Sequence, residues 1–103
     1  DNGHYIRSIE PGLSPIKIGK IHTWTVQVTT PKGKPVEHAQ ITINGGMPRH
    51  GHGLPTKPRM TAELGGGRYQ IDGMKFNMRG WWTVTVSVSG PAGPDTLTFN
   101  LIL

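Results

Sequence analysis

The sequence predicts an all-β fold, an immunoglobulin-like antiparallel β-sandwich of about seven strands. Several segments alternate apolar and polar residues with a period of two, which is typical of strands with one buried face. The 15 Gly and 9 Pro separate these segments, as expected of turn residues. No segment has the length and the period of a helix. An open barrel is the alternative architecture.

Two strands are expected in the first half of the chain. The first covers residues 22–29, in which apolar Trp and Val residues alternate with Thr and Gln. The segment PKGKPV then supplies turn residues. The second strand, 36–44, places Ala39, Ile41 and Ile43 on one face. We expect the two strands to pair as a β-hairpin.

The last third of the chain repeats the alternation in two further strands, 81–88 and 96–103. The segment SGPAGPD between them is a predicted turn. Weaker strand patterns occupy 4–9, 60–64 and 68–74, and the GGG run before the last of these is expected to form a hairpin turn.

Length and composition limit the class of protein. A chain of 103 residues fits one domain, which we place at 1–103. The formal charge is +5, but the Lys and Arg residues are scattered and accompany no nucleic-acid-binding motif, so no nucleic acid partner is expected. There is no Cys, which excludes disulfides and Cys-based metal sites.

No apolar run is long enough to span a membrane, so no membrane span is expected in this chain. The first residues, DNGHYIRSIE, lack the basic and apolar regions of a signal peptide. We expect that any signal or anchor has been removed. The expected location is periplasmic or extracytoplasmic, where a site built without thiolates avoids oxidation.

One segment interrupts the strand pattern. Residues 45–58, GGMPRHGHGLPTKP, contain four Gly and three Pro and show no sustained alternation, so we expect a long loop that could bind a metal at about 45–60. This loop holds Met47, His50 and His52. All four methionines of the chain fall between positions 47 and 78.

Copper is the metal that these side chains suit. A thioether is a soft ligand that prefers Cu(I), whereas imidazole binds both Cu(I) and Cu(II). None of the residues from 45 to 62 is Asp or Glu, which argues against calcium, magnesium and manganese. His50 and His52 would project to the same side of an extended backbone. With Met47, and with Met78 from a second turn-like segment, they form the predicted copper site.

Further residues are candidates with simpler explanations. Met60 and Met74 are possible additional ligands, although core packing accounts for both. His22 shares an apolar face with Trp24 and Val26, and we expect a structural histidine that could lie near the copper loop. By alternation Trp82 points inward and Trp81 outward, and either indole could shield a bound ion.

A binding protein is expected rather than an enzyme. The chain has no Cys for a blue-copper site, and its first residue is Asp1, not the His of a histidine brace. We predict a Cu(I) chaperone or storage module that exchanges copper with a donor or acceptor protein. The alternative is an accessory domain that contacts another protein and whose Met and His residues are structural.

The segments GGMPRHGHGLPTKP and GRYQIDGMKFNMRGWWTVTV together resemble the YtkA-like group of extracytoplasmic domains, which is related to FixH. The resemblance runs from about residue 21 to the final strand. It implies an immunoglobulin-like sandwich, exported or membrane-anchored, that serves in copper handling or in the assembly of copper-dependent oxidases. The residues that it implicates are Met47, His50, His52 and Met78, with Trp81 or Trp82 nearby.

Overall fold

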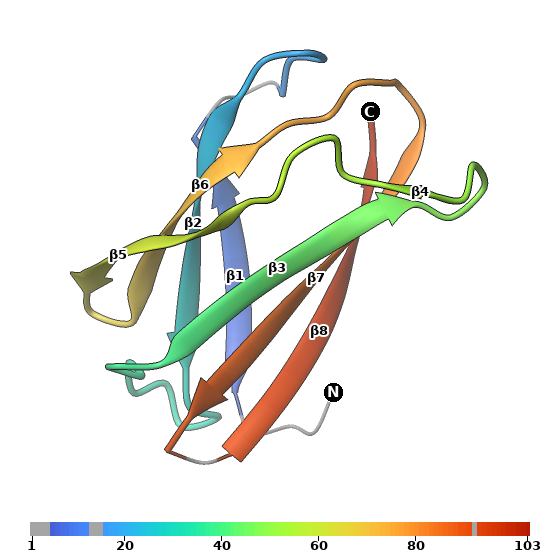
Figure 1. Cartoon of the computed structure of the whole chain (residues 1–103). Coiled ribbons are helices and arrows are strands. Elements are labelled where there is room, and N and C mark those ends of the chain that lie inside the picture. Colours follow the sequence, from blue (N-terminus) through green and yellow to red (C-terminus); the bar gives the residue numbers. More distant parts are fainter. Residues whose placement is uncertain (1–4, 13–15, 92) are drawn as a thin grey trace.

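A computed structural model describes residues 5–12, 16–91 and 93–103, and within these it contains strands and no helix (Figure 1). Asp1 and His4, where the first predicted strand begins, lie outside the described residues. No helix in the described part is long and apolar enough to cross a membrane. The strands are β1 (Ile6–Pro11), β2 (His22–Thr29), β3 (Gln40–Met47), β4 (His52–Gly53), β5 (Arg59–Gly65), β6 (Arg68–Met74), β7 (Trp81–Gly90) and β8 (Gly93–Ile102).

The strands form two four-stranded antiparallel sheets that face each other, which confirms the predicted β-sandwich. One sheet has the order β1-β2-β6-β5 and the other the order β4-β3-β7-β8. The predicted hairpins β5–β6 and β7–β8 are both present, with Gly65 paired to Arg68 and Gly90 to Gly93. The sandwich measures 36 × 24 × 20 Å.

The predicted hairpin between β2 and β3 is wrong. β2 lies between β1 and β6 in one sheet, and β3 lies between β4 and β7 in the other, so the connection crosses from sheet to sheet (Figure 1). The chain leaves β2 through a bridge between Thr29 and Pro35, and Val36 then donates a backbone hydrogen bond to Val28. Alternation shows which face of a strand is buried, but it does not show whether a neighbouring strand pairs with it or faces it across the core.

The segment 45–58, predicted to be one long loop, contains the end of β3 and the short strand β4. β3 continues to Met47, and the short strand β4 returns beside it, so the segment opens with a tight β-hairpin. Gly45 and Gly46 are part of β3. Glycine is needed at position 45 because the neighbouring strand β7 approaches closely: a Cβ at Gly45 would lie 2.6 Å from the Thr83 carbonyl oxygen. The alternation therefore persists through the glycines, and Met47 keeps the inward face of β3.

The core between the sheets is built from the inward faces of β2, β3, β6 and β7. As predicted, Trp82 points inward and is fully buried, whereas Trp81 is only partly buried. Tyr69 in β6 holds the connection between β2 and β3, since its hydroxyl accepts from the Ala39 amide at 3.1 Å and donates to the Val36 carbonyl at 2.6 Å. This framework fixes the strand ends that carry the candidate site.

Candidate metal centre

The methionines and histidines of the two sequence motifs meet at one end of the sandwich. At this end β3 and β6 finish and β2 and β7 begin (Figure 1). The β3–β4 hairpin contributes one side, and the 75–80 connection from β6 to β7 contributes the other. We call this the Met/His end.

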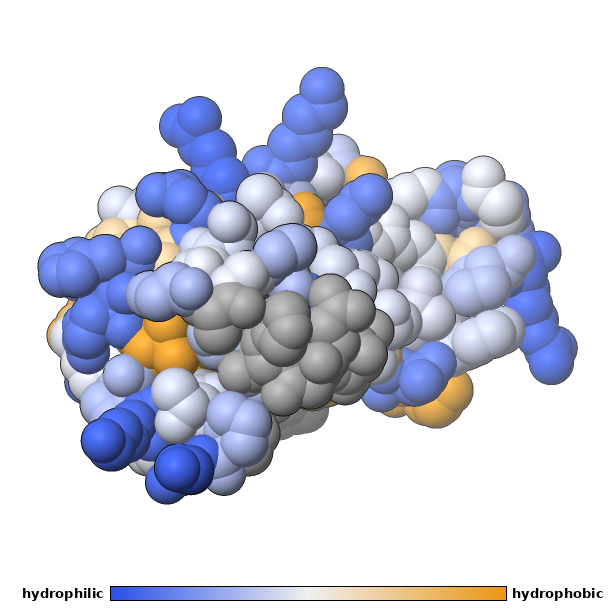
Figure 2. Space-filling view, turned by 90° about the horizontal axis from the view of Figure 1, so that it is seen from below, coloured by the Kyte–Doolittle hydropathy of each residue, from blue (hydrophilic) through white to orange (hydrophobic). Residues whose placement is uncertain are grey.

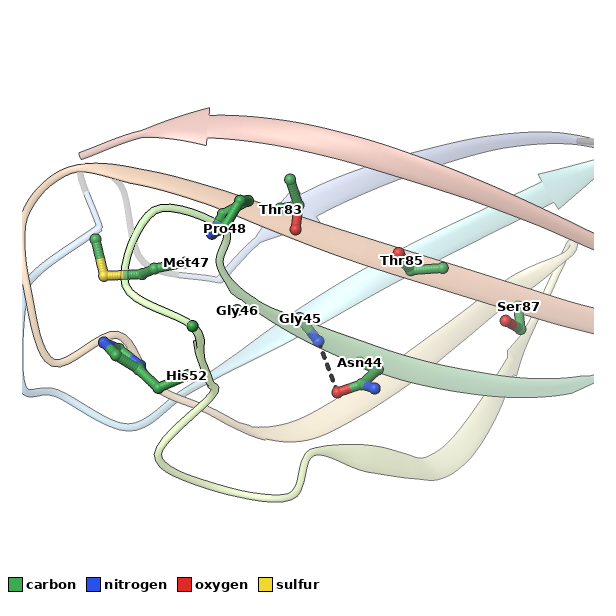
Figure 3. A pocket seen from close by; sticks show the side chains of 10 residues that line it. Asn44, Gly45, Gly46, Met47, Pro48, His52, Thr83, Thr85 and Ser87 are labelled. Atoms are coloured by element: carbon green, nitrogen blue, oxygen red, sulfur yellow. Dashed lines mark hydrogen bonds between the residues drawn. The ribbon is translucent and has the colours of Figure 1, made fainter.

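Met47 and His52 are direct cross-strand partners in the β3–β4 hairpin. Side chains of such a pair lie on the same face of a sheet, with Cβ atoms about 4.5–5.5 Å apart. Figure 3 shows both side chains extending to the same side, toward the connection between β6 and β7. A thioether and an imidazole are thus held side by side by the backbone ladder.

His50 reaches the same place by a different route from the one predicted. It lies in the turn of the hairpin, not in an extended segment, where the amides of His50 and Gly51 both donate to the Met47 carbonyl at 3.1 Å. Gly51 adopts a φ of 66°, which permits this tight turn. The rings of His50 and His52 lie nearly parallel, at an interplanar angle of 26°, with centroids 6.0 Å apart.

This separation is compatible with one shared ion. With metal–nitrogen bonds of about 2 Å, the centroids of two imidazoles on one ion lie at most roughly 6.4 Å apart. The rings of His50 and His52 lie within that limit. Both side chains are exposed, so an ion can reach them from solvent.

The hydrogen bond of His52 leaves one ring nitrogen free for a metal. Its Nδ1 lies 3.1 Å from the Gly53 carbonyl oxygen, which can only accept, so Nδ1 carries the proton and donates. Nε2 then keeps its lone pair. Metal-binding histidines characteristically donate their other ring N–H in this way, which fixes tautomer and ring orientation.

Aromatic rings support the histidines from the core side. The His52 ring contacts Trp82 edge to face with centroids 5.9 Å apart, and Trp82 in turn contacts Phe76 at 5.1 Å. Trp81 lies on the outer face and donates from its indole N–H to the Asn100 side chain. Trp82 therefore adjoins the candidate ligands, as expected for a shielding residue, and Phe76 is a neighbour that the sequence did not single out.

Met47 is 2 % exposed, and it lines a groove of about 510 Å³ together with Arg49, His50, Gly80 and Trp81. Its methyl group would lie only 2.8 Å from a Cβ at Gly80, so the absence of a side chain at Gly80 makes room for it. Arg49 brings a positive charge to the groove, which weakens the binding of a cation there. Neither Gly80 nor Arg49 was predicted, although both stand inside the two motifs.

Met78 lies in the connection between β6 and β7 and is 40 % exposed. Its backbone carbonyl accepts a hydrogen bond from the Trp82 indole at 3.0 Å, which fixes the Met78 backbone beside the ring that contacts His52. Met78 therefore belongs to the same end of the molecule as His52. Its assignment as a ligand stays a prediction.

The other three candidates occupy structural environments. Met60 is half-buried in β5 and packs against the core, and Met74 is fully buried at the end of β6. His22 is opposite Met74 and has both ring nitrogens in hydrogen bonds. Its Nε2 accepts from the Trp24 indole at 2.9 Å and its Nδ1 donates to the Lys20 carbonyl at 3.0 Å, because an indole only donates. His22 therefore has no free lone pair in this arrangement.

The donor set of the Met/His end fits copper. No three His, Asp, Glu or Cys side chains come together as a metal-binding group in the part of the chain that the structure describes. Thioether sulfur and imidazole are the donors present at this end, and that combination would suit a soft ion such as Cu(I).

The fold and the site define a small all-β domain with a methionine and histidine cluster at one end of a sandwich. The family model for YtkA-like proteins matches residues 11–87, which is most of the chain. The chain belongs to the YtkA-like family. No curated protein and no solved structure gave a significant match.

Proposed function

We propose that this protein binds Cu(I) at the Met/His end and serves as an extracytoplasmic copper chaperone or storage module rather than as an enzyme. The proposed ligands are Met47, His50 and His52, with Met78 as the fourth. Copper is the cargo that the chain takes up and passes on by ligand exchange. Cu(II) would use the two imidazoles, because thioethers bind the oxidised ion less well.

The observation that carries the proposal is the cross-strand pair of Met47 and His52, in which the Nδ1 proton of His52 is committed to the Gly53 carbonyl. A soft sulfur and a free Nε2 therefore lie on one face of the hairpin. The exposed ring of His50 adds a ligand at the solvent side. The positive charge of Arg49 favours reversible binding, as transfer requires.

A Cu(I) competition titration in reducing buffer tests the proposal. We expect one equivalent of Cu(I) to be withdrawn from a weak chelator by the native protein and to be lost in a His50→Ala, His52→Ala variant. The matched control is His38→Ala, which also removes an exposed imidazole but from the opposite end of the sandwich. Failure of the native protein to compete would refute copper binding.

The burial of Met47 favours a second candidate function. A methionine that is 2 % exposed and fits against Gly80 is also what a purely structural residue would look like. In that case the chain would be an accessory domain that contacts another protein. Removal of His50 and His52 would then leave the metal content unchanged and impair binding of that protein.

A further inference from the structure

Exposed apolar side chains gather at the Met/His end. Four large hydrophobic residues are exposed among the described residues, and three of them, Ile21, Met78 and Ile102, are found here. Ile102 is 78 % exposed and pairs across the β7–β8 ladder with Trp81. Scattered apolar residues need no explanation, but several at one place indicate an interaction surface.

Cations surround these apolar residues. Arg49 lines the groove that Trp81 and Ile102 also line. Lys17 and Arg79 line an adjacent groove. Gly80 of the first groove and Leu103 of the second exchange backbone hydrogen bonds at 2.9 Å. The Gly19 amide donates to the Phe76 carbonyl at 2.7 Å and so holds the segment that contains Lys17 beside the connection from β6 to β7.

Two further Lys residues are sequence neighbours of residues already named at this end. Lys20 precedes Ile21, and Lys75 precedes Phe76. We call the five residues Lys17, Lys20, Arg49, Lys75 and Arg79 the basic rim. No acidic residue lines either groove in the described part of the chain.

Three of the acidic residues lie at the far end, whereas Glu10 and Asp72 lie one and two residues before the ends of β1 and β6, and Asp72 accepts hydrogen bonds from Thr61 and Gln70. Glu63 holds the His38 amide, and Glu37 accepts from the Gly67 amide, both near the β5–β6 turn at the far end. Asp95 accepts from the Tyr5 amide near the β7–β8 turn. On the coloured part of the face that carries this turn and the β2–β3 connection, hydrophobic residues form small, separate patches (Figure 2). The basic rim and three of the four large exposed hydrophobic residues of the described chain thus lie at the end that holds the candidate ligands.

We propose that the Met/His end is a docking surface for a protein with an acidic face, and that Cu(I) is exchanged with that protein across this surface. An apolar centre with a charged rim is the usual anatomy of a protein interface. The rim has a single sign, so the complementary partner carries Asp and Glu around its own metal ligands. The exchange of Cu(I) rests on the proposed copper-binding function, whereas the docking of an acidic protein does not.

The transfer needs no co-reactant. As each Cu(I) bond to His50, His52 or a thioether breaks, a bond to a sulfur or imidazole of the partner forms, and the copper stays in the +1 state. An arriving partner would meet the exposed ligands His50, His52 and Met78 first, because Met47 is buried. Rim charges would speed the encounter rather than change the exchange itself.

Two synthetic acceptor peptides test the proposal. Both carry the same Met-x-x-Met segment as Cu(I) ligand, and one is flanked by Glu residues and the other by Lys residues. Stopped-flow transfer from the copper-loaded protein should be faster to the acidic peptide by about tenfold at low salt, and the difference should vanish at high salt. Equal rates at low salt would overturn the proposal.

Charge-reversal variants locate the effect. Lys17→Glu with Arg79→Glu should remove the preference for the acidic peptide. The matched control, Lys32→Glu with Lys34→Glu, makes the same change in net charge in the exposed connection that follows β2 at the far end, and should retain the preference. If the control loses it equally, net charge alone is responsible and the docking surface is refuted.

Two further measurements distinguish protein docking from copper binding and from membrane binding. NMR titration of the metal-free protein with the acidic peptide should shift the amide signals of Gly80 and Trp81 even if the protein binds no copper. Failure of the copper proposal can therefore be told apart from failure of the docking proposal. Sedimentation with vesicles of phosphatidylcholine and phosphatidylserine should leave the protein in solution. Binding to these vesicles that Lys17→Glu with Arg79→Glu abolishes would assign the surface to a membrane and overturn the proposal.

Discussion

Replacing Met47 by leucine tests whether Met47 is a copper ligand or only a core residue. The thioether is 2 % exposed, and leucine has a similar volume. Exchange of Met for Leu in a core usually costs less than about 1.5 kcal/mol. The metal-free Met47→Leu variant should therefore unfold within about 6 °C of the native protein, since 1 kcal/mol corresponds to roughly 4 °C in a chain of this size.

Copper should distinguish the two proteins. At a free Cu(I) concentration of about 100 times the Kd, binding stabilises the native fold by about 2.7 kcal/mol, or roughly 11 °C in Tm. Loss of a ligand should weaken binding by at least the 10–100-fold that changes around a metal ligand typically cause. With about 100-fold weaker binding, the stabilisation at the same copper concentration falls to about 0.4 kcal/mol, or roughly 2 °C.

Anaerobic scanning calorimetry at buffered Cu(I) measures both shifts. Met60→Leu is the matched control, because Met60 is a half-buried methionine in β5 that packs against the core. We expect it to keep the full copper-induced rise in Tm. The reasoning fails if Met47→Leu rises as much as the native protein, which would leave Met47 as a packing residue. Loss of the shift in Met60→Leu would require a different set of ligands.

Two other predictions concern the framework. Tyr69→Phe should lower the free energy of unfolding by about 2–3 kcal/mol in urea titration, because the Ala39 amide and the Val36 carbonyl lose a buried partner; a loss below about 0.5 kcal/mol would contradict this. The His38 amide donates to the Glu63 carboxylate and lowers its pKa below the ordinary value of 4.5, so this contact stabilises the fold above that pH and is lost as the pH falls through the lowered value. The stability of Glu63→Gln should consequently change less than that of the native protein between neutral and acidic pH, and an equal change would rule out this contribution.

The sequence determined the architecture in large part because strand alternation is local. Residues 22–29 and 81–88 alternate so regularly that their buried faces follow from the chain itself, and the structure confirms them in β2 and β7. Gly45 and Gly46 obscured the same signal, since glycine contributes no side chain to the pattern. The sequence therefore predicts a loop at the end of β3, although the backbone remains extended there.

The candidate site shows the same division. Residue type and spacing brought Met47, His50 and His52 together in one motif, because soft and borderline ligands in a short segment have few other uses. The sequence did not reveal that Met47 and His52 are cross-strand partners, since this depends on the register of a hairpin it did not predict. It predicted a structural role for His22 and a metal-binding role for His52, but not the hydrogen bonds that occupy both ring nitrogens of His22 and leave Nε2 of His52 free.

Local chemistry thus determined which residue types this chain offers to a metal and which faces of its strands are buried. Only the tertiary structure decided which sheet each strand joins and which residues meet at one end. It brought the 17–20 segment, the β3–β4 hairpin and the 75–80 connection to the same place, and so gathered the exposed apolar residues and the basic rim around the candidate ligands. The physical reason is that pairing and packing join residues far apart in the sequence, and no local pattern encodes which partner is chosen.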